Sequence, residues 1–279
     1  MLKLLERSIN GVDQRLLLLA PPHVSVDSFF KNLDPDRRRR GDLVREVQQL
    51  RGGIYLHDGA LQPKQLSPGG LHRTPEDDKC WHLLFMNRHQ RVGACVWYLE
   101  HDNTTTVDHL RVRNCALANR EEWRVPLQCA VESELARARR DRMRYAELGG
   151  WAVAKESRCT SEGLLLALAA YSLGRVLGGA LGITMATVRH SSSTILRRLG
   201  GSHLKAKGIM IPPYYDERYR CEMELLRFDS RRPNPKYAGL IDQLSEKLAG
   251  VRVLGTRSAL SRPPAGASAP HEPQHVPAA

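Results

Sequence analysis

The sequence predicts an α+β fold in which helices flank both faces of a mixed, mostly antiparallel sheet of about six or seven strands. Three observations indicate this architecture. Two apolar runs, 81–86 and 92–100, are joined by a polar turn, as in a β-hairpin. Residues 146–201 follow the order strand, turn, helix, strand, helix. Residues 218–228 alternate between polar and apolar side chains, which is typical of a half-buried strand that completes the core.

The first 51 residues predict a helical region. Leucines spread over 1–20 favour an amphipathic helix that ends at Pro21-Pro22, and 41–51 resumes a helical pattern. Between them, 34–40 (DPDRRRR) predicts a turn followed by four consecutive arginines. We interpret the arginines as a solvated face, with contact to phosphates or to an acidic partner as the alternative.

The remaining elements outside the central unit are predicted one by one. A brief strand is expected at 54–57, a third strand at 105–112 and a helix at 126–143, where Pro126 is acceptable in the first turn. A terminal helix at 234–248 lies in the predicted C-terminal helical region, 231–251. The segment 252–279 is rich in Pro, Ala and Ser and is predicted to be a disordered tail.

The central unit carries the strongest indication of a ligand site. A strand at 147–154 leads through a polar turn to Ser161, a suitable N-cap, and to a helix that ends at Gly178-Gly179. A buried strand at 181–188 and a short helix at 191–199 follow. Such a turn directs unpaired backbone N–H groups and the positive end of the helix dipole at one point, which favours a phosphate-bearing ligand.

Charge and cysteine usage limit the possible partners and the compartment. The net charge of +12 favours an anionic partner (nucleic acid, an acidic carrier protein, an anionic cofactor or a membrane surface) or else a solvated basic surface. The six cysteines include no C-x-x-C pair and the eleven histidines are dispersed, so no metal site is predicted. Charges interrupt the leucines of 1–20, and Arg175 interrupts the apolar run 163–186. We therefore expect a reduced, cytoplasmic protein without a membrane span.

The turn after the central strand resembles a known motif. Residues 158–163 match the pattern Arg/Gln-x-x-Gly-x-Gly/Ala at Arg158 and Gly163, with Ser161 in place of the middle glycine. In this respect the chain resembles the GNAT superfamily of N-acetyltransferases, whose turn holds the pyrophosphate of coenzyme A. The resemblance implies that Val153, Arg158, Thr160, Ser161 and Gly163 bind such a cofactor, and it makes 52–230 the predicted acyltransferase domain.

A narrower resemblance lies in the strand before that turn. Residues 147–153 (ELGGWAV) are similar to the corresponding strand of the acyl-homoserine-lactone (autoinducer) synthases and the related N-acyl amino acid synthases. The acidic stretch 76–78 and the hairpin strand at 91–94 are similar to that group as well. Two arginines of the lactone-forming branch are replaced here by Gly150 and Val96, which places the chain closer to the N-acyl amino acid synthases.

This resemblance implies transfer of an acyl group from acyl-CoA or an acyl carrier protein to a small amine or amino acid, without a metal. Glu147 is the candidate general base, with a structural ion pair at the strand end as the alternative. The helix at 191–199 lacks the tyrosine that serves as general acid in the family, so His190 is the nearest candidate. Trp81, Trp97 and Trp151 are candidates for an acyl pocket, with ordinary core packing as the alternative.

Two other functions remain open at this point. One is an acetyl-CoA-dependent N-acetyltransferase that acts on a protein or a polyamine. The other is a non-catalytic basic module that binds nucleic acid through the arginines of 37–40 and 137–144. That module is disfavoured, because the basic stretches lack the interleaved aromatic residues of single-strand binders. Nucleic acid is therefore not the expected partner.

Overall fold

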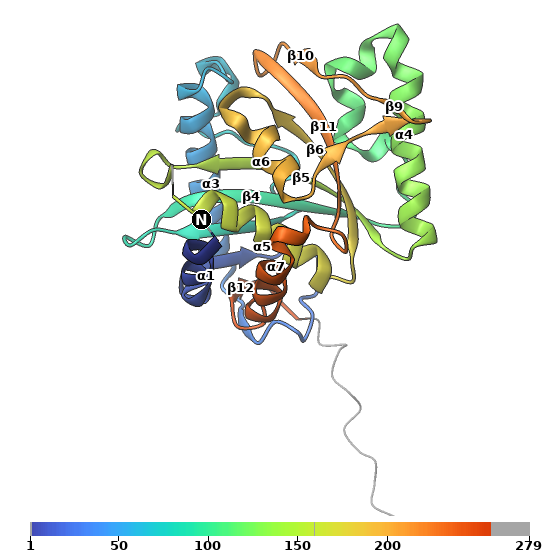
Figure 1. Ribbon diagram of the computed structural model, residues 1–279. Coiled ribbons are helices and arrows are strands. Elements are labelled where there is room, and N and C mark those ends of the chain that lie inside the picture. The colour runs from blue at the N-terminus through green and yellow to red at the C-terminus, as the bar shows by residue number, and fades with distance from the viewer. Residues whose placement is uncertain (1, 159, 258–279) are drawn as a thin grey trace, which may run out of the picture.

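The computed structural model describes residues 2–158 and 160–257 (Figure 1). The helices of this part are α1 Leu2–Asn10, α2 Val12–Arg15, α3 Arg37–His57, α4 Glu121–Arg140, α5 Glu162–Val176, α6 Ser192–Leu199 and α7 Pro235–Lys247. Its strands are β1 Leu16–Leu19, β2 Asn32–Asp34, β3 Trp81–Met86, β4 Val92–His101, β5 Arg144–Val153, β6 Ala180–Thr187, β7 Ser202–His203, β8 Lys205–Ala206, β9 Ile209–Met210, β10 Tyr214–Asp216, β11 Cys221–Asp229 and β12 Arg252–Leu254.

One large mixed sheet forms the centre of the fold. Its strand order is β10-β11-β6-β5-β4-β3-β1-β12-β2, with β7 also paired to β11. The pairs β5–β6, β1–β12 and β12–β2 are parallel, and the other pairs are antiparallel. The mixed sheet flanked by helices is therefore confirmed. It is wider than predicted, because several very short strands extend its two edges.

Helices cover both faces of the sheet, and each face has its own core. On one face α5 packs against β3 and β4, α7 packs on α5, and α1 packs on α7 (Figure 1). On the other face α3 packs against β4 and β5, and α4 packs against β5 and β6. Side chains alternate accordingly along the central strands, so that Ala146 lies in the α5 core and Tyr145 in the α4 core.

The N-terminal prediction of one helix over 1–20 is wrong in its second half. α1 ends at Asn10, and Leu16–Leu19 form β1, which pairs with β3 and β12. All four leucines are buried, because both faces of this strand are covered. A strand that is buried on both faces has a continuous apolar run rather than an alternating one, and a leucine run is easily taken for helix.

The predicted tail also contributes to the sheet. β12 falls within the segment 252–279 that was expected to be disordered, and it lies between β1 and β2. Its side chains Val253 and Leu254 are fully buried. The rest of the predicted tail, 258–279, lies outside the described residues.

Three further predictions need correction. The helix expected from residue 41 begins earlier and includes the arginine run: Asp36 caps α3 by accepting from the N–H of Arg39 at 2.9 Å, and the helix begins at Arg37. The same helix runs to His57 and therefore includes the strand expected at 54–57. The third strand expected at 105–112 is replaced by two 3-10 turns, Val107–His109 and Arg111–Asn114.

None of the described helices has the length and apolar character that a membrane span requires.

His82 on β3 is a buried histidine that makes the stability depend on pH. Its Nε2 donates to the carbonyl oxygen of Asp77 at 2.8 Å, and its Nδ1 is buried without a partner in the described part of the chain. Burial lowers the pKa of His82 from 6.5 to about 4. As the pH falls, the unfolded state takes up a proton before the folded state does. The free energy of unfolding should therefore fall by about 3 kcal/mol between roughly pH 6.5 and pH 4.

Urea unfolding across that pH range tests this expectation in the parent protein and in His82→Gln, whose amide keeps the bond to Asp77. The variant should lose less stability on acidification. His89→Gln is the control, because His89 lies exposed in the β3–β4 turn. Equal pH dependence in all three proteins would contradict the assignment.

Candidate functional site

The parallel strands β5 and β6 separate part-way along their length. Their pairing ends at Leu148 and Thr184, yet β5 continues to Val153 and β6 to Thr187. Thr184 Oγ1 donates to the carbonyl oxygen of Leu148 at 2.8 Å and so closes the paired part. Beyond this point the facing edges of the two strands are not paired to each other, and a gap opens in the middle of the sheet.

A β-bulge in β5 lies where the separation begins. The register between β4 and β5 shifts between Cys95 and Trp97, so that β5 has one residue more than β4 at this place. Gly150 in the bulge has φ +64°, a conformation that glycine adopts without strain. A Cβ on Gly149 would lie 2.3 Å from the indole of Trp97, so the two glycines also make room for that ring.

Val153, predicted to contact the cofactor, presents its backbone to the gap. The next residue, Ala154, donates its N–H to the carbonyl oxygen of Gly93 on β4 at 2.8 Å. Backbone groups of successive strand residues point to opposite sides, so the N–H of Val153, which faces Ala94, points away from β4. It therefore points toward the side from which β6 has separated.

The turn after β5 brings the N-terminus of α5 against the strand end. Thr160 Oγ1 donates to the carbonyl oxygen of Ser157 at 2.7 Å and accepts from the N–H of Glu162 at 3.2 Å. A Cβ on Gly163 would lie 3.3 Å from Val153 Cγ2, tighter than most real contacts. Glycine at 163 thus permits this close approach. Ser161 is the N-cap residue by position, but its hydroxyl lies 3.0 Å from Ser8 Oγ instead of capping the helix.

Arg158 lies at the edge of this turn and is paired with an acidic residue. Its Nη2 lies 2.9 and 3.1 Å from the two carboxylate oxygens of Asp58, the C-cap residue of α3. Arg189, which follows β6, donates to the carbonyl oxygen of the same Asp58. These contacts bring the C-terminus of α3 beside the ends of β5 and β6.

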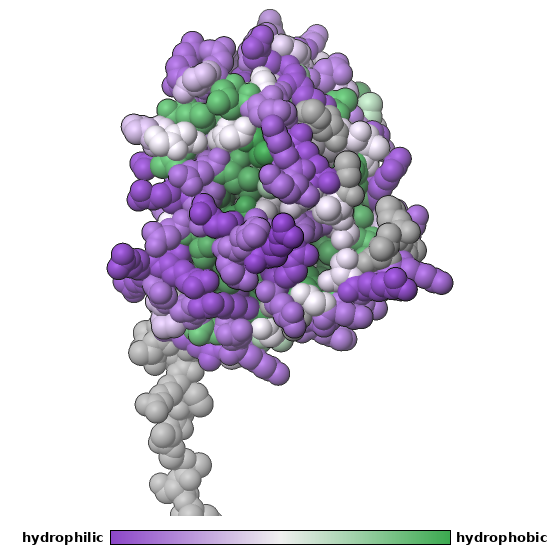
Figure 2. Space-filling model, turned by 90° about the vertical axis from the view of Figure 1, so that its left-hand side faces the viewer, coloured by the Kyte–Doolittle hydropathy of each residue, from purple (hydrophilic) through white to green (hydrophobic). Residues whose placement is uncertain are grey.

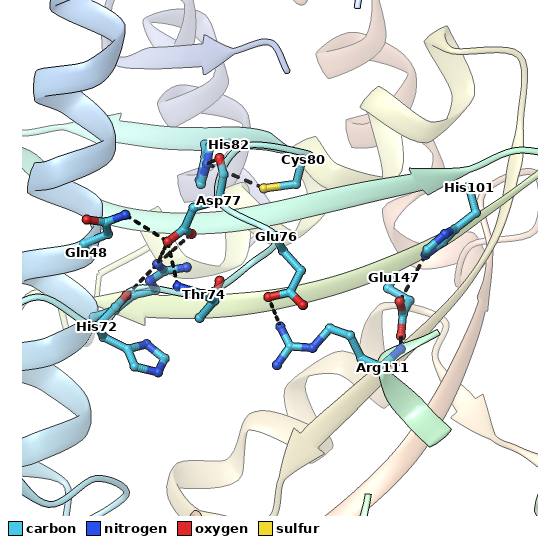
Figure 3. A network of polar contacts seen from close by, with 11 residues as sticks. Gln48, His72, Thr74, Glu76, Asp77, Cys80, His82, His101, Arg111 and Glu147 are labelled. Atoms are coloured by element: carbon cyan, nitrogen blue, oxygen red, sulfur yellow. Dashed lines mark hydrogen bonds and ion pairs between the residues drawn. The ribbon is translucent and has the colours of Figure 1, made fainter. Parts of the chain in front are cut away.

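Glu147 is the buried acid of the site, with 3% of its surface exposed. Its Oε1 accepts from the backbone N–H of Arg111 at 2.8 Å, and its Oε2 lies 3.0 Å from His101 Nε2 (Figure 3). The Arg111 side chain pairs with Glu76 at 3.0 Å, and its guanidinium lies 5.0 Å from the ring centre of Trp97. The chain thus gathers a carboxylate, an imidazole and an aromatic face on the α3/α4 side of β5.

The acidic stretch 76–78 divides between the core and the surface. Asp77 is buried and its carboxylate binds Arg51 Nη2 at 2.7 and 2.8 Å, while Asp78 is exposed. Arg51 comes from α3 and was missed by sequence reasoning, because it lies in an ordinary helical pattern. A Cβ on Gly150 would lie 3.2 Å from Arg51 Nη1. The guanidinium of Arg51 therefore reaches the position at which the resemblance expected an arginine on β5.

The three candidate tryptophans do not gather in one pocket. Trp81 packs in the α5 core, with its ring centre 5.6 Å from that of Phe30. Trp97 lies on the opposite face near Glu147, as described above. Trp151 packs beside Gly163 at the N-terminus of α5, and its Nε1 is buried without a partner among the described residues. The side chain of His190 lies outside the part of the chain that the structure describes.

The surface around the turn is hollowed. The turn after β5 and the start of α5 lie at the left of Figure 1, on the side that faces the viewer in Figure 2. There, hydrophobic residues are visible in a recess that hydrophilic residues surround (Figure 2).

Within residues 2–158 and 160–257, no group of three or more His, Cys, Asp or Glu side chains lies close enough together to bind a metal ion.

No model of a known protein family matches the chain, and no curated protein sequence matches it. Among solved structures, the chain is similar to BjaI, a CoA-dependent acyl-homoserine lactone synthase, in its complex with SAM and isopentyl-CoA. The TM-score is 0.51 at 13% identity, over 88% of this chain and 93% of the synthase. The complex of BjaI with MTA gives the same TM-score of 0.51 at 12% identity, with the same coverage of 88% and 93%.

The chain shares the fold of this synthase. The fold that the resemblance implied is thereby confirmed. A weaker likeness, with a TM-score of 0.41 at 12% identity over 72% of this chain and 90% of the other, is to FeeM, an N-acyl amino acid synthase from uncultured soil microbes.

Proposed function

We propose that the protein is an N-acyltransferase that moves an acyl group from a thioester to the amine of a small molecule or amino acid. The observation that carries this proposal is the gap between β5 and β6, which opens beside the glycine-containing N-terminus of α5. A pantetheine thioester is long and narrow and would fit in this gap. Backbone N–H groups of β5 would line it, and the N-terminus of α5 would bind the phosphates at its entrance. The shared fold with BjaI, whose structure contains isopentyl-CoA, supports the same assignment.

The donor side of the site follows from the turn. The N–H groups of the first turn of α5, with Thr160, Ser161 and Gly163, would hold the phosphates of acyl-CoA or of a carrier protein's prosthetic group. Arg158 adds positive charge at the mouth and would share its guanidinium between Asp58 and the phosphates. The N–H of Val153 is our candidate to donate to the thioester oxygen as negative charge develops there.

The acceptor side is formed by Glu147 and His101. In the proposed reaction the amine nitrogen attacks the thioester carbon, a C–N bond forms, and the C–S bond breaks as the thiolate leaves. Glu147, with His101 at 3.0 Å, would receive the proton that the amine loses through a chain of waters, since six positions of β5 separate it from Val153. Trp97 and Arg111 lie beside this pair and would form one wall of the acceptor subsite.

Gly163→Val tests the donor site by filling the contact between α5 and β5. The added side chain begins 3.3 Å from Val153 Cγ2 and 3.6 Å from Trp151 Cζ2, so it should push the first turn of α5 away from β5 and displace the N–H groups that would bind the phosphates. We expect the dissociation constant for coenzyme A to rise by about tenfold or more, which is about 1.4 kcal/mol of binding free energy. Calorimetric titration with coenzyme A, acetyl-CoA and a long-chain acyl-CoA measures this change.

Gly239→Val is the matched control, because Gly239 lies in helix α7 and a Cβ there meets no heavy atom within 4 Å. It carries the same β-branched cost in a helix and should leave the affinity unchanged. Equal affinity of the two variants for coenzyme A would rule out the proposed donor site. Tighter binding of the long-chain thioester than of acetyl-CoA would favour an N-acyl synthase over an acetyltransferase.

A further inference from the structure

The geometry points to a second ligand site, for a compact polyanion, at the opposite end of the sheet from the proposed thioester site. A cavity of about 450 Å³ lies there between the C-terminus of α4, the end of β11 and the loop after β11. Its charged lining residues are Arg137, Arg140, Asp141, Arg227, Asp229 and Arg232. A volume of this size is typical of small-molecule sites in proteins.

The position of this cavity separates it from the gap between β5 and β6. In the sheet, Asp229 at the end of β11 lies opposite Leu181 near the beginning of β6. Arg144 at the beginning of β5 donates its N–H to the carbonyl oxygen of Gly179. The proposed phosphate-binding turn follows Val153 at the other end of β5. The ten residues of β5 span about 30 Å at roughly 3.3 Å per residue. A ligand in the cavity therefore does not occupy the thioester site.

The lining carries more positive than negative charge. Four guanidinium groups face two carboxylates, which leaves a formal excess of two positive charges. Arg137 forms ion pairs with both carboxylates: its Nη2 lies 2.6 Å from Asp229 Oδ2, and its Nε lies 3.4 Å from Asp141 Oδ2. Arg140 shares Asp141 at 3.3 Å. The carboxylates are thus already engaged, and Glu134, which lies outside the lining, pairs with Arg227 and offsets one positive charge. An anionic ligand would balance the charge that remains.

One lining residue carries a buried donor that has no partner among the described residues. Arg227 donates from Nε to Glu134 at 2.8 Å, but its Nη2 is buried and unpaired. A buried donor without an acceptor costs about 1–3 kcal/mol, and a ligand oxygen would remove that cost.

These features define the chemistry of the ligand. Guanidinium groups bind phosphate and carboxylate oxygens through paired N–H donors, and several of them together select for multiple charges. The ligand is therefore a small metabolite with at least two negative charges, carried by phosphate or by carboxylate groups.

Calorimetric titration with inorganic pyrophosphate and with citrate, at constant ionic strength, tests this site. We expect saturable binding of at least one of the two probes, and the probe that binds more tightly identifies phosphate or carboxylate as the preferred group. The double variant Arg140→Ser/Arg232→Ser should weaken binding by about tenfold or more.

The matched control is Arg37→Ser/Arg38→Ser, which removes the same charge from exposed positions at the start of α3. It should change the affinity by less than about twofold, because exposed charges act weakly at a distance. The inference is overturned if neither probe binds saturably or if both double variants lose affinity equally. It is also overturned if Arg158→Ser abolishes binding while Arg140→Ser/Arg232→Ser does not, since the anion would then occupy the turn before α5.

Discussion

Asp77→Ala is expected to lower the free energy of unfolding by about 3–5 kcal/mol, the cost of leaving one charge of a buried pair without its partner. Arg51 is fully buried, and its contacts to Asp77 are 2.7 and 2.8 Å. Burial alone would raise the pKa of Asp77, but the charge of Arg51 and the hydrogen bonds that the carboxylate accepts lower it. The carboxylate is therefore ionised, and its removal leaves the Arg51 guanidinium charged inside the core.

Asp78→Ala is the control, because Asp78 is the exposed neighbour of Asp77, and it should change stability by less than about 1 kcal/mol. The double variant Arg51→Leu/Asp77→Ala removes both charges and should be more stable than Asp77→Ala alone. Urea unfolding of the four proteins measures these differences. If Asp77→Ala and Asp78→Ala unfold at the same urea concentration, the pair contributes nothing and the assignment fails.

The sequence was sufficient to predict the elements whose patterns are local. The hairpin of β3 and β4 and the unit from β5 to α6 were found because alternation, turn residues and glycine stops lie within the elements themselves. β1 and β12 were not found, because what makes them strands is their pairing with each other, more than 230 positions apart in the chain. Their apolar content is equally compatible with a helix or a loop until that partner is known.

The candidate site shows the same division. Glu147, Val153 and Gly163 were predicted from two motifs in one continuous stretch of the chain, and the structure places them along β5 and at the start of α5. His101, Arg111 and Arg51 were missed, because each comes from a different element and carries no local signature. Arg51 shows the reason most clearly. The resemblance expected an arginine at position 150, and here a guanidinium reaches the same place from α3.

Glu147→Gln is expected to lower the turnover number by about a hundredfold or more, the usual contribution of a general base. Glutamine has the shape of glutamate and still accepts from the N–H of Arg111, so the fold and the affinity for coenzyme A should be retained. Thiol release from acyl-CoA in the presence of a panel of amino acids measures the rate. Glu76→Gln is the matched control, because it neutralises a nearby carboxylate that pairs with Arg111. Among the described residues, no hydrogen bond or ion pair joins Glu76 to Glu147 or His101.

The pH profile separates a base from a residue that only positions its neighbours. An amine that has already lost its proton does not need a base, so the deficit of Glu147→Gln should shrink as the pH rises toward the pKa of the amine. A purely structural role would give a deficit that is the same at every pH. If Glu147→Gln keeps most of the turnover at neutral pH while coenzyme A still binds, the proton leaves by another route. Glu147 would then be the structural ion-pair partner at the strand end that the sequence also allowed.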